Sequence, residues 1–238
     1  MITGEYKNYN HYIQKKWSKD PKESFKKLAS LIESSDFKEE SSVLDIGCAT
    51  GELINFLKER FKNFRFTGLD VEYELIKEAK RLLPDVKFVK SSVLNLKEHI
   101  NESFDIVLAL GVLGIIDIDE SSAFFDNLFH CTKKKGKIYI FSHFNTYDVD
   151  VITRHRKYSD GKVGDWEKGW NIYSIETISN LLNNRCQAFK FHEFRLPFLM
   201  APIDDPVRTW TVKTENNPYQ LTNGLKLMVD LSFLEIEV

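Results

Sequence analysis

Short apolar runs alternate with amphipathic stretches between residues 41 and 145, and this alternation constrains the fold most. Each apolar run has the length of a buried strand, and each amphipathic stretch gathers its apolar side chains on one helical face. Strands that alternate with helices in this way form a parallel sheet with helices on both faces. The expected strands are SSVLDIG, FRFTGLDV, VKFVKSS, FDIVLALGVL and GKIYIFSHF.

The first strand runs into the turn VLDIGCATGEL, whose glycines allow a ligand to approach the backbone closely. The turn lacks the Gly-Lys-Ser/Thr ending of a P-loop. A dinucleotide fingerprint requires a small residue five positions after Gly47, but Glu52 stands there and would face the phosphates unfavourably. Asp45 lies two residues before Gly47, where it could pair with a cationic group.

Four segments, taken in order, resemble the class I S-adenosylmethionine-dependent methyltransferases. VLDIGCATG resembles the first motif of that family, GLDV the second, FDIVLALGVL the fourth-strand motif, and KKKGKIYI the turn into the fifth strand. The resemblance covers residues 40 to 145 well and the rest of the chain weakly. It implies a Rossmann-like, mostly parallel sheet of seven strands with an antiparallel final strand. It also implies S-adenosyl-L-methionine as the cofactor and S-adenosyl-L-homocysteine as the product.

The resemblance assigns roles to particular residues around the first turn. Asp70 is expected to bind both ribose hydroxyls, Val71 to pack against the adenine, and Asp45 to help hold the amino-acid end of the cofactor. Two positions depart from the family pattern: Ala49 replaces a more frequent glycine, and Ser92 stands where an acid often faces the adenine amine. The candidate cofactor-binding residues are Tyr12, Asp45, Gly47, Cys48, Ala49, Gly51, Asp70, Val71, Ser92, Val93, Leu110 and Gly111.

The segment after the fifth strand supplies the candidate catalytic and substrate residues. His143 follows that strand directly and is either a general base, since an imidazole titrates near neutral pH, or a hydrogen-bonded wall residue. Arg154 and Arg156 are two positions apart in a long polar and aromatic insertion, where they could clamp a phosphate or a carboxylate or simply be solvated. The candidate substrate-binding residues are Asn145, Arg154, Arg156 and Trp170.

The chain is expected to form one methyltransferase domain with four parts. These are N-terminal cap helices in residues 1–40, a cofactor-binding core in residues 41–145, a lid-like insertion in residues 146–173, and a C-terminal completion of the sheet in residues 174–238. The strands expected within DPVRTWTVKTE and LKLMVDLSFLEIEV would complete the sheet as an antiparallel pair.

Composition limits the classes of partner. A net charge of -2 gives no general attraction to nucleic acid or to an anionic membrane, and no apolar run is long enough to span a bilayer. The three cysteines are too far apart for a disulfide framework or a zinc finger, so a cytoplasmic location is expected. The acids at 117 and 119 give only weak support for a metal, and none is expected. We expect a monomer or a homodimer.

The favoured interpretation is in-line methyl transfer to a small acceptor that is anionic or sugar-linked. Orientation of the acceptor and exclusion of water would supply much of the rate, because the sulfonium already activates the methyl group. Two alternatives from other classes stay open. One is a catalytically silent subunit that only binds S-adenosylmethionine, and the other is a nicotinamide-dependent oxidoreductase, against which Glu52 and Asp45 count.

Overall fold

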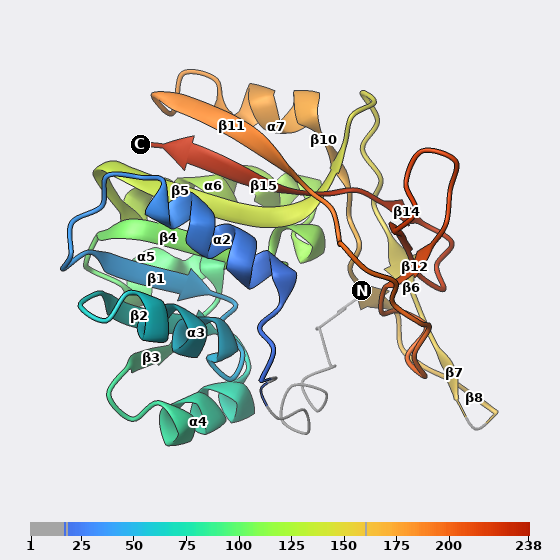
Figure 1. Ribbon diagram of the computed structural model, residues 1–238, viewed down its shortest axis with the longest axis horizontal. Coiled ribbons are helices and arrows are strands. Elements are labelled where there is room, and N and C mark those ends of the chain that lie inside the picture. Colours follow the sequence, from blue (N-terminus) through green and yellow to red (C-terminus); the bar gives the residue numbers. More distant parts are fainter. Residues whose placement is uncertain (1–16, 18, 160) are drawn as a thin grey trace.

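The computed structural model describes residue 17 and residues 19–159 and 161–238, so the candidate Tyr12 lies outside the described residues (Figure 1). Strands and helices alternate along the first part of the chain as expected. They are α2 (Glu23–Glu33), β1 (Ser42–Ile46), α3 (Glu52–Arg60), β2 (Arg65–Asp70), α4 (Tyr73–Leu82), β3 (Lys87–Lys90), η1 (Val93–Asn95), α5 (Leu96–His99), β4 (Phe104–Leu110), η2 (Leu113–Ile115), α6 (Ile118–Cys131) and β5 (Thr132–Asn145).

The main sheet has the strand order β11-β15-β5-β4-β1-β2-β3, where β11 is Ala188–Phe194 and β15 is Leu231–Glu237. Strands β1 to β5 are parallel to one another, whereas β15 is antiparallel to both β5 and β11. The arrows of β1 and β15 therefore point in opposite directions in Figure 1. This confirms the expected Rossmann-like sheet with an antiparallel final strand.

Helices cover both faces of the sheet, and each face has its own apolar core. One core contains Leu28 of α2, Ile54 of α3 and Ile76 of α4. The other contains side chains of α5, α6 and of α7 (Ile175–Leu182), among them Phe124 and Ile178. Every residue of β1 is buried, because this strand lies in the middle of the sheet and is covered on both faces.

The first described helix, α2, begins at Glu23, and Lys22 occupies its N-cap without a side-chain hydrogen bond. Asp20, just before the helix, accepts a hydrogen bond from Lys26 Nζ at 3.1 Å. A lysine side chain therefore connects this acid to the first turn of the helix.

The prediction for the C-terminal strands was partly wrong. β15 does complete the main sheet, but it pairs with β11 on one edge and with β5 on the other. With both edges of β15 occupied, the preceding strand has no place beside it. Residues before β15 instead form a separate antiparallel sheet of three short strands, β12 (Trp210–Val212), β13 (Gln220–Thr222) and β14 (Met228–Val229).

The insertion after β5 consists of two short antiparallel ribbons. β6 (Arg154–His155) pairs with β9 (Glu167–Lys168), and β7 (Tyr158–Ser159) pairs with β8 (Lys162–Val163). The chain then returns to the main sheet through the short strand β10 (Tyr173–Ser174), which pairs with the end of β5. Figure 1 shows the insertion and the three-stranded sheet together on the side toward which β1 points.

In the described part of the chain, no helix is both long enough and apolar enough to cross a membrane.

Candidate active site

The glycine turn after β1 is tied to the end of β2. The backbone N–H groups of Gly47 and Cys48 both donate to the Leu69 carbonyl, at 2.7 and 3.0 Å. Gly47, Ala49 and Gly51 have φ angles of +74°, +47° and +85°, a left-handed conformation that glycine adopts readily. Ala49, which replaces the more frequent glycine, is therefore accommodated in the same backbone conformation.

The two glycines of this turn face protein rather than open space. A Cβ on Gly47 would lie 2.7 Å from Val112 Cγ2, and one on Gly51 would lie 3.1 Å from Leu83 Cδ1. Gly111 at the end of β4 differs, because a Cβ there would meet no atom of the described residues within 4 Å. Of these three glycines, Gly111 is the one that leaves room for a ligand.

Asp70 ends β2 and connects that strand to the glycine turn. Its Oδ2 accepts a hydrogen bond from the Ala49 N–H at 2.9 Å, and its Oδ1 accepts one from the Glu72 N–H at 3.0 Å. Burial raises the pKa of this carboxyl, although the backbone N–H groups oppose the change. Each oxygen has a second lone pair that could accept a hydroxyl hydrogen. The next residue, Val71, exposes 49% of its surface and could cover an apolar ring.

Asp45 is the most perturbed acid at this edge of the sheet. It is only 3% exposed, and its Oδ2 has no hydrogen-bond partner among the described residues. Burial, with a further contribution from the charge of Asp70, raises the pKa of Asp45 to about 8, while Lys22 acts in the opposite direction. A buried carboxyl with an unused oxygen fits a site for a cationic group, since burial of an unpaired acid is otherwise costly.

Other candidate residues around the turn serve the local structure. Ser92 Oγ accepts a hydrogen bond from the Leu94 N–H at 3.2 Å and caps η1, so this hydroxyl is already engaged. The side chains of Cys48 and Val93 are buried in the two apolar cores. Burial raises the pKa of the Cys48 thiol well above its ordinary value, which makes it a poor nucleophile. Leu110 is partly buried beside Gly111.

His143 lies near the end of β5, against the insertion. Its ring centroid is 4.7 Å from that of Trp170, and its Nδ1 would be 3.3 Å from a Cβ on Gly114. This Nδ1 is buried and has no hydrogen-bond partner among the described residues. Burial lowers the pKa of His143 to about 4, although the Asn171 backbone opposes the change. The imidazole is therefore neutral at neutral pH.

Asn171 fixes the insertion to the segment that follows β4. It is fully buried, and its Nδ2 donates to the Ile116 carbonyl at 2.8 Å. Its backbone N–H donates to the Gly114 carbonyl at 2.9 Å, and its Oδ1 accepts from the Thr153 N–H at 2.9 Å. Trp170 has a φ of +66°, which is strained for a tryptophan, and these bonds on the next residue hold it in that conformation.

The two arginines of the expected clamp do not act together. Arg154 donates to Asp117 Oδ1 at 2.6 Å, and Lys168 from the other strand of the ribbon contacts Asp117 Oδ2 at 2.7 Å. Burial would raise the pKa of Asp117, but these two cations hold it below its usual value. Arg156 instead lies 4.8 Å from the Trp166 ring.

The side chain of Asn145 makes hydrogen bonds within its own loop. Its Nδ2 donates to the Val149 carbonyl at 2.9 Å, and its Oδ1 accepts from the Tyr147 N–H at 3.1 Å. Arg154 and Asn145 thus both have structural partners, which leaves Arg156 and Trp170 as the substrate candidates of the insertion. No group of three or more His, Cys, Asp and Glu side chains within the described residues could hold a metal ion.

Sequence reasoning missed the role of Asp117. This acid is the N-cap of α6, in a capping box with Glu120, and it also anchors both strands of the β6–β9 ribbon. The capping box was visible as Asp-x-x-Glu before an apolar helix, and it would have placed the helix start correctly. The ion pairs were not visible, because Arg154 lies 37 positions from Asp117 along the chain.

Replacing Asp117 with alanine is expected to destabilise the protein by about 2 kcal/mol and to lower its Tm by about 4–8 °C. The reason is that two partly buried cations and the N-cap of α6 lose their acceptor together. Differential scanning calorimetry measures the shift, and Asp119→Ala, an exposed acid of the same helix turn, is the control. Equal melting temperatures for the two variants would contradict the anchoring role.

Comparison with known proteins agrees with this geometry. Residues 43–136 match the sequence family described as a methyltransferase domain, and these residues contain the glycine turn, Asp45, Asp70 and Gly111. Residues 43–136 are therefore a methyltransferase domain. The family resemblance seen in the sequence is therefore confirmed. The methyltransferase domain contains the glycine turn and the two acids of the candidate site.

Relatives of the methyltransferase domain have several different names. Malonyl-[acyl-carrier protein] O-methyltransferase 2 of Ilyobacter polytropus is 23% identical over 171 residues, which are 71% of this chain and 63% of that protein. Trans-aconitate 2-methyltransferase of Escherichia coli is 33% identical over 67 residues, which are 28% of this chain and 26% of that protein. This chain spans 45%, 63% and 62% of the first three curated relatives that it matches.

Solved structures share the fold of the methyltransferase domain at low sequence identity. An S-adenosylmethionine-dependent methyltransferase from Clostridium acetobutylicum has a TM-score of 0.56 at 14% identity, with 90% of this chain and 92% of that chain covered. The plantazolicin methyltransferase BamL, solved with a triazolic analogue and SAH, has a TM-score of 0.57 at 19% identity and covers 90% of this chain and 83% of its own. At such identities the likeness establishes the fold alone.

Proposed function

We propose that this chain binds S-adenosylmethionine at the glycine turn and transfers its methyl group to a small acceptor. The observation that carries this proposal is the buried Asp45, whose free oxygen lies at the same edge of the sheet as Asp70 and the open side of Gly111. When bound, the cofactor would supply a methyl group activated by the sulfonium. The plantazolicin methyltransferase BamL, which has the same fold, was solved in complex with SAH, and this supports the choice of cofactor.

The residues at this edge would divide the work of binding. Asp70 would accept hydrogen bonds from the two ribose hydroxyls while it keeps its bonds to the Ala49 and Glu72 backbone. Val71, which is exposed beside Asp70, would pack against the adenine. Asp45 would pair, as a carboxylate, with the ammonium group of the methionine part.

The acceptor atom in this proposal is an oxygen that is already ionised, in a carboxylate or a phosphate. An anionic oxygen needs no general base, and His143 is poorly suited to be one, because burial lowers its pKa to about 4. We therefore assign His143 the wall role, together with Trp170, whose ring it contacts. The relatives named for malonyl-[acyl-carrier protein] and for trans-aconitate support an acidic acceptor.

His143→Gln is expected to reduce kcat by less than about fivefold, whereas loss of a true general base would cost at least about 100-fold. Transfer of a labelled methyl group to a panel of di- and tricarboxylic acids measures this, at saturating cofactor. With an anionic acceptor and His143 neutral, kcat should be flat from about pH 6 to 9. A large loss in His143→Gln, with kcat rising through one ionisation, would instead make His143 the base.

A further inference from the structure

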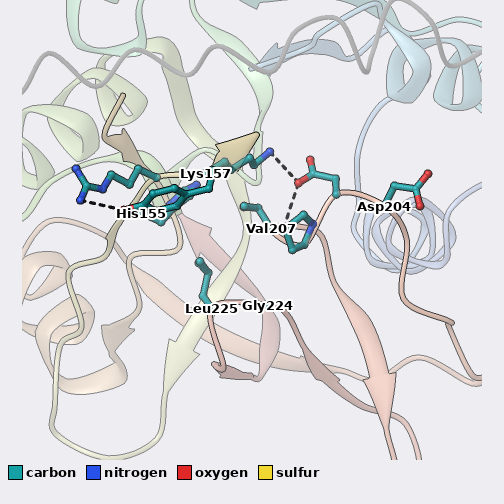
Figure 2. A pocket seen from close by; sticks show the side chains of 10 residues that line it. His155, Lys157, Asp204, Val207, Gly224 and Leu225 are labelled. Atoms are coloured by element: carbon teal, nitrogen blue, oxygen red, sulfur yellow. Dashed lines mark hydrogen bonds and ion pairs between the residues drawn. The ribbon is translucent and has the colours of Figure 1, made fainter. Parts of the chain in front are cut away.

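A cavity of about 600 Å³ lies between the insertion and the C-terminal part of the chain. One wall consists of residues 155–158 of the insertion, and the other consists of residues 204–207 with Gly224 and Leu225. Lys157 Nζ contacts Asp205 Oδ1 at 2.8 Å and joins the two walls, and Figure 2 shows this lysine reaching toward the segment that carries Asp204 and Val207. The cavity is therefore formed before any ligand binds.

The C-terminal wall is tightly packed behind its surface. The Gly224 N–H donates to the Pro206 carbonyl at 2.7 Å, and a Cβ on Gly224 would lie 2.6 Å from that oxygen. Asp205 is held by Lys157 and also by Arg208, whose Nε is 3.6 Å from Asp205 Oδ2. Because its carboxylate serves two cations, Asp205 acts as a structural link between the walls.

Two charged side chains of the cavity are left for a ligand, one of each sign. Arg156 makes no ion pair with any described residue, and its polar contact is with the Tyr158 hydroxyl at 3.4 Å. Asp204 is exposed on the opposite wall and likewise makes no ion pair within the described part of the chain. A simple anion would suit Arg156 but would be repelled by Asp204, so the cavity fits a ligand that has more than one kind of group.

Aromatic rings lie beside the unpaired arginine. Arg156 is 5.8 Å from the Tyr158 ring and 4.8 Å from the Trp166 ring. Tyr158 is 69% exposed and Trp166 is 43% exposed, so both rings keep a large area free. Aromatic surface of this kind packs against apolar C–H faces, while the nearby polar groups hydrogen-bond to hydroxyls.

We propose that this cavity binds a sugar that carries an anionic group, either a sugar phosphate or a sugar acid. The anion would pair with Arg156 through a planar guanidinium, which suits phosphates and carboxylates. The carboxylate of Asp204 would accept hydrogen bonds from the sugar hydroxyls, and Tyr158, which lines the cavity, would pack against the ring. Trp166 does not line the cavity and would act only through Arg156, which lies 4.8 Å from its ring. The sugar would be the part of the methyl acceptor that the protein recognises, and in that respect alone the inference rests on the proposed function.

Calorimetric titration of the whole chain with glucose 1-phosphate and with glucuronate tests the proposal. At least one of them is expected to bind about tenfold more tightly than either glucose or inorganic phosphate. The reason is that the sugar and the anionic group of one ligand both contribute to its binding. Whichever binds identifies the source of the anionic group. Equal affinity for inorganic phosphate and glucose 1-phosphate would reduce the cavity to a plain anion site, and no binding at millimolar concentration would overturn the proposal.

Variants separate the two charged groups. Arg156→Gln should weaken the binding of the better sugar ligand about tenfold or more. Asp204→Asn should also weaken it, yet leave inorganic phosphate bound equally or more tightly, because a like charge is removed. The matched control is Arg185→Gln, which removes an arginine that pairs with Asp126 and lies 5.1 Å from the Phe129 ring, outside the cavity. Unchanged sugar binding in Arg156→Gln would contradict the assignment.

The same samples titrated with S-adenosylhomocysteine distinguish the two proposals. Sugar binding without S-adenosylhomocysteine binding would keep the cavity as a sugar site and remove the proposed cofactor. S-adenosylhomocysteine binding without sugar binding would keep the methyltransferase proposal and remove the sugar site. In all three variants S-adenosylhomocysteine binding should remain intact, since none of the residues lies among those assigned to the cofactor.

Discussion

Asp70→Ala is expected to weaken the binding of S-adenosylhomocysteine by at least about 100-fold, which corresponds to at least about 2.7 kcal/mol. The variant would lose two hydrogen bonds from ribose hydroxyls to a charged acceptor, and such bonds contribute about 1.5–3 kcal/mol each. It would also remove the Asp70 carboxylate that accepts from the N–H groups of Ala49 and Glu72, so the glycine turn would lose one of its connections to the end of β2. Isothermal titration calorimetry measures the affinity directly.

Two control variants separate binding from folding. Asp85→Ala removes an exposed acid of the loop before β3, which pairs with Lys58, and it should change the affinity less than about twofold. Asp70→Asn keeps the shape and the hydrogen-bond acceptor of the side chain but removes the charge. A folded Asp70→Ala protein that binds S-adenosylhomocysteine like the wild type would show that Asp70 is only a structural acid.

Asp45→Asn is expected to stabilise the free protein at pH 8 by up to about 5 kcal/mol, and to have no such effect at pH 4. The folded-state pKa of about 8 lies above the ordinary value of 3.8. The contribution of this carboxyl to stability is therefore fully present below about pH 4 and is lost as the pH rises toward 8. Asparagine keeps the neutral form at every pH. Urea unfolding at both pH values measures the difference, and equal gains would contradict a raised pKa.

Binding of the cofactor is expected to deprotonate the Asp45 carboxyl. In the free protein at pH 7 this carboxyl is mostly protonated, because its pKa is about 8. An ammonium group beside it would favour the carboxylate, so binding should release up to about one proton for each S-adenosylhomocysteine. Titrations in phosphate and in Tris buffer, whose ionisation enthalpies differ, measure this proton. Asp45→Asn should bind more weakly and release no proton from this group, and identical proton release in both proteins would exclude Asp45 as the partner.

The main sheet could be predicted because its signals are local. The apolar strand β4 and the turn after β1 are each recognisable within a few residues, and their alternation with helices leaves few alternative folds. Asp70 was predictable for the same reason, since its position follows from where β2 ends. The raised pKa of Asp45 was not predictable, because it depends on burial and on the charge of Asp70, which reaches it from a neighbouring strand.

The insertion and the C-terminal part could not be predicted in the same way. Arg154 looks like an anion ligand in the sequence, but its charge is taken by Asp117, which belongs to the start of α6. Arg156 and Asp204 are distant in the sequence, yet both line the cavity between the insertion and the C-terminal part of the chain. The two-residue and three-residue strands of these parts have no periodic pattern of their own, so tertiary contacts decide where they lie.

The most direct test of the account is calorimetric titration of the purified wild-type chain with S-adenosylhomocysteine, with NAD as the matched dinucleotide control. The account predicts one site with a Kd of about 10 μM or tighter for S-adenosylhomocysteine and no heat of binding for NAD. Binding of NAD without binding of S-adenosylhomocysteine would contradict the proposed cofactor and would favour an oxidoreductase. Binding of neither would mean that the glycine turn, Asp45 and Asp70 serve the fold alone.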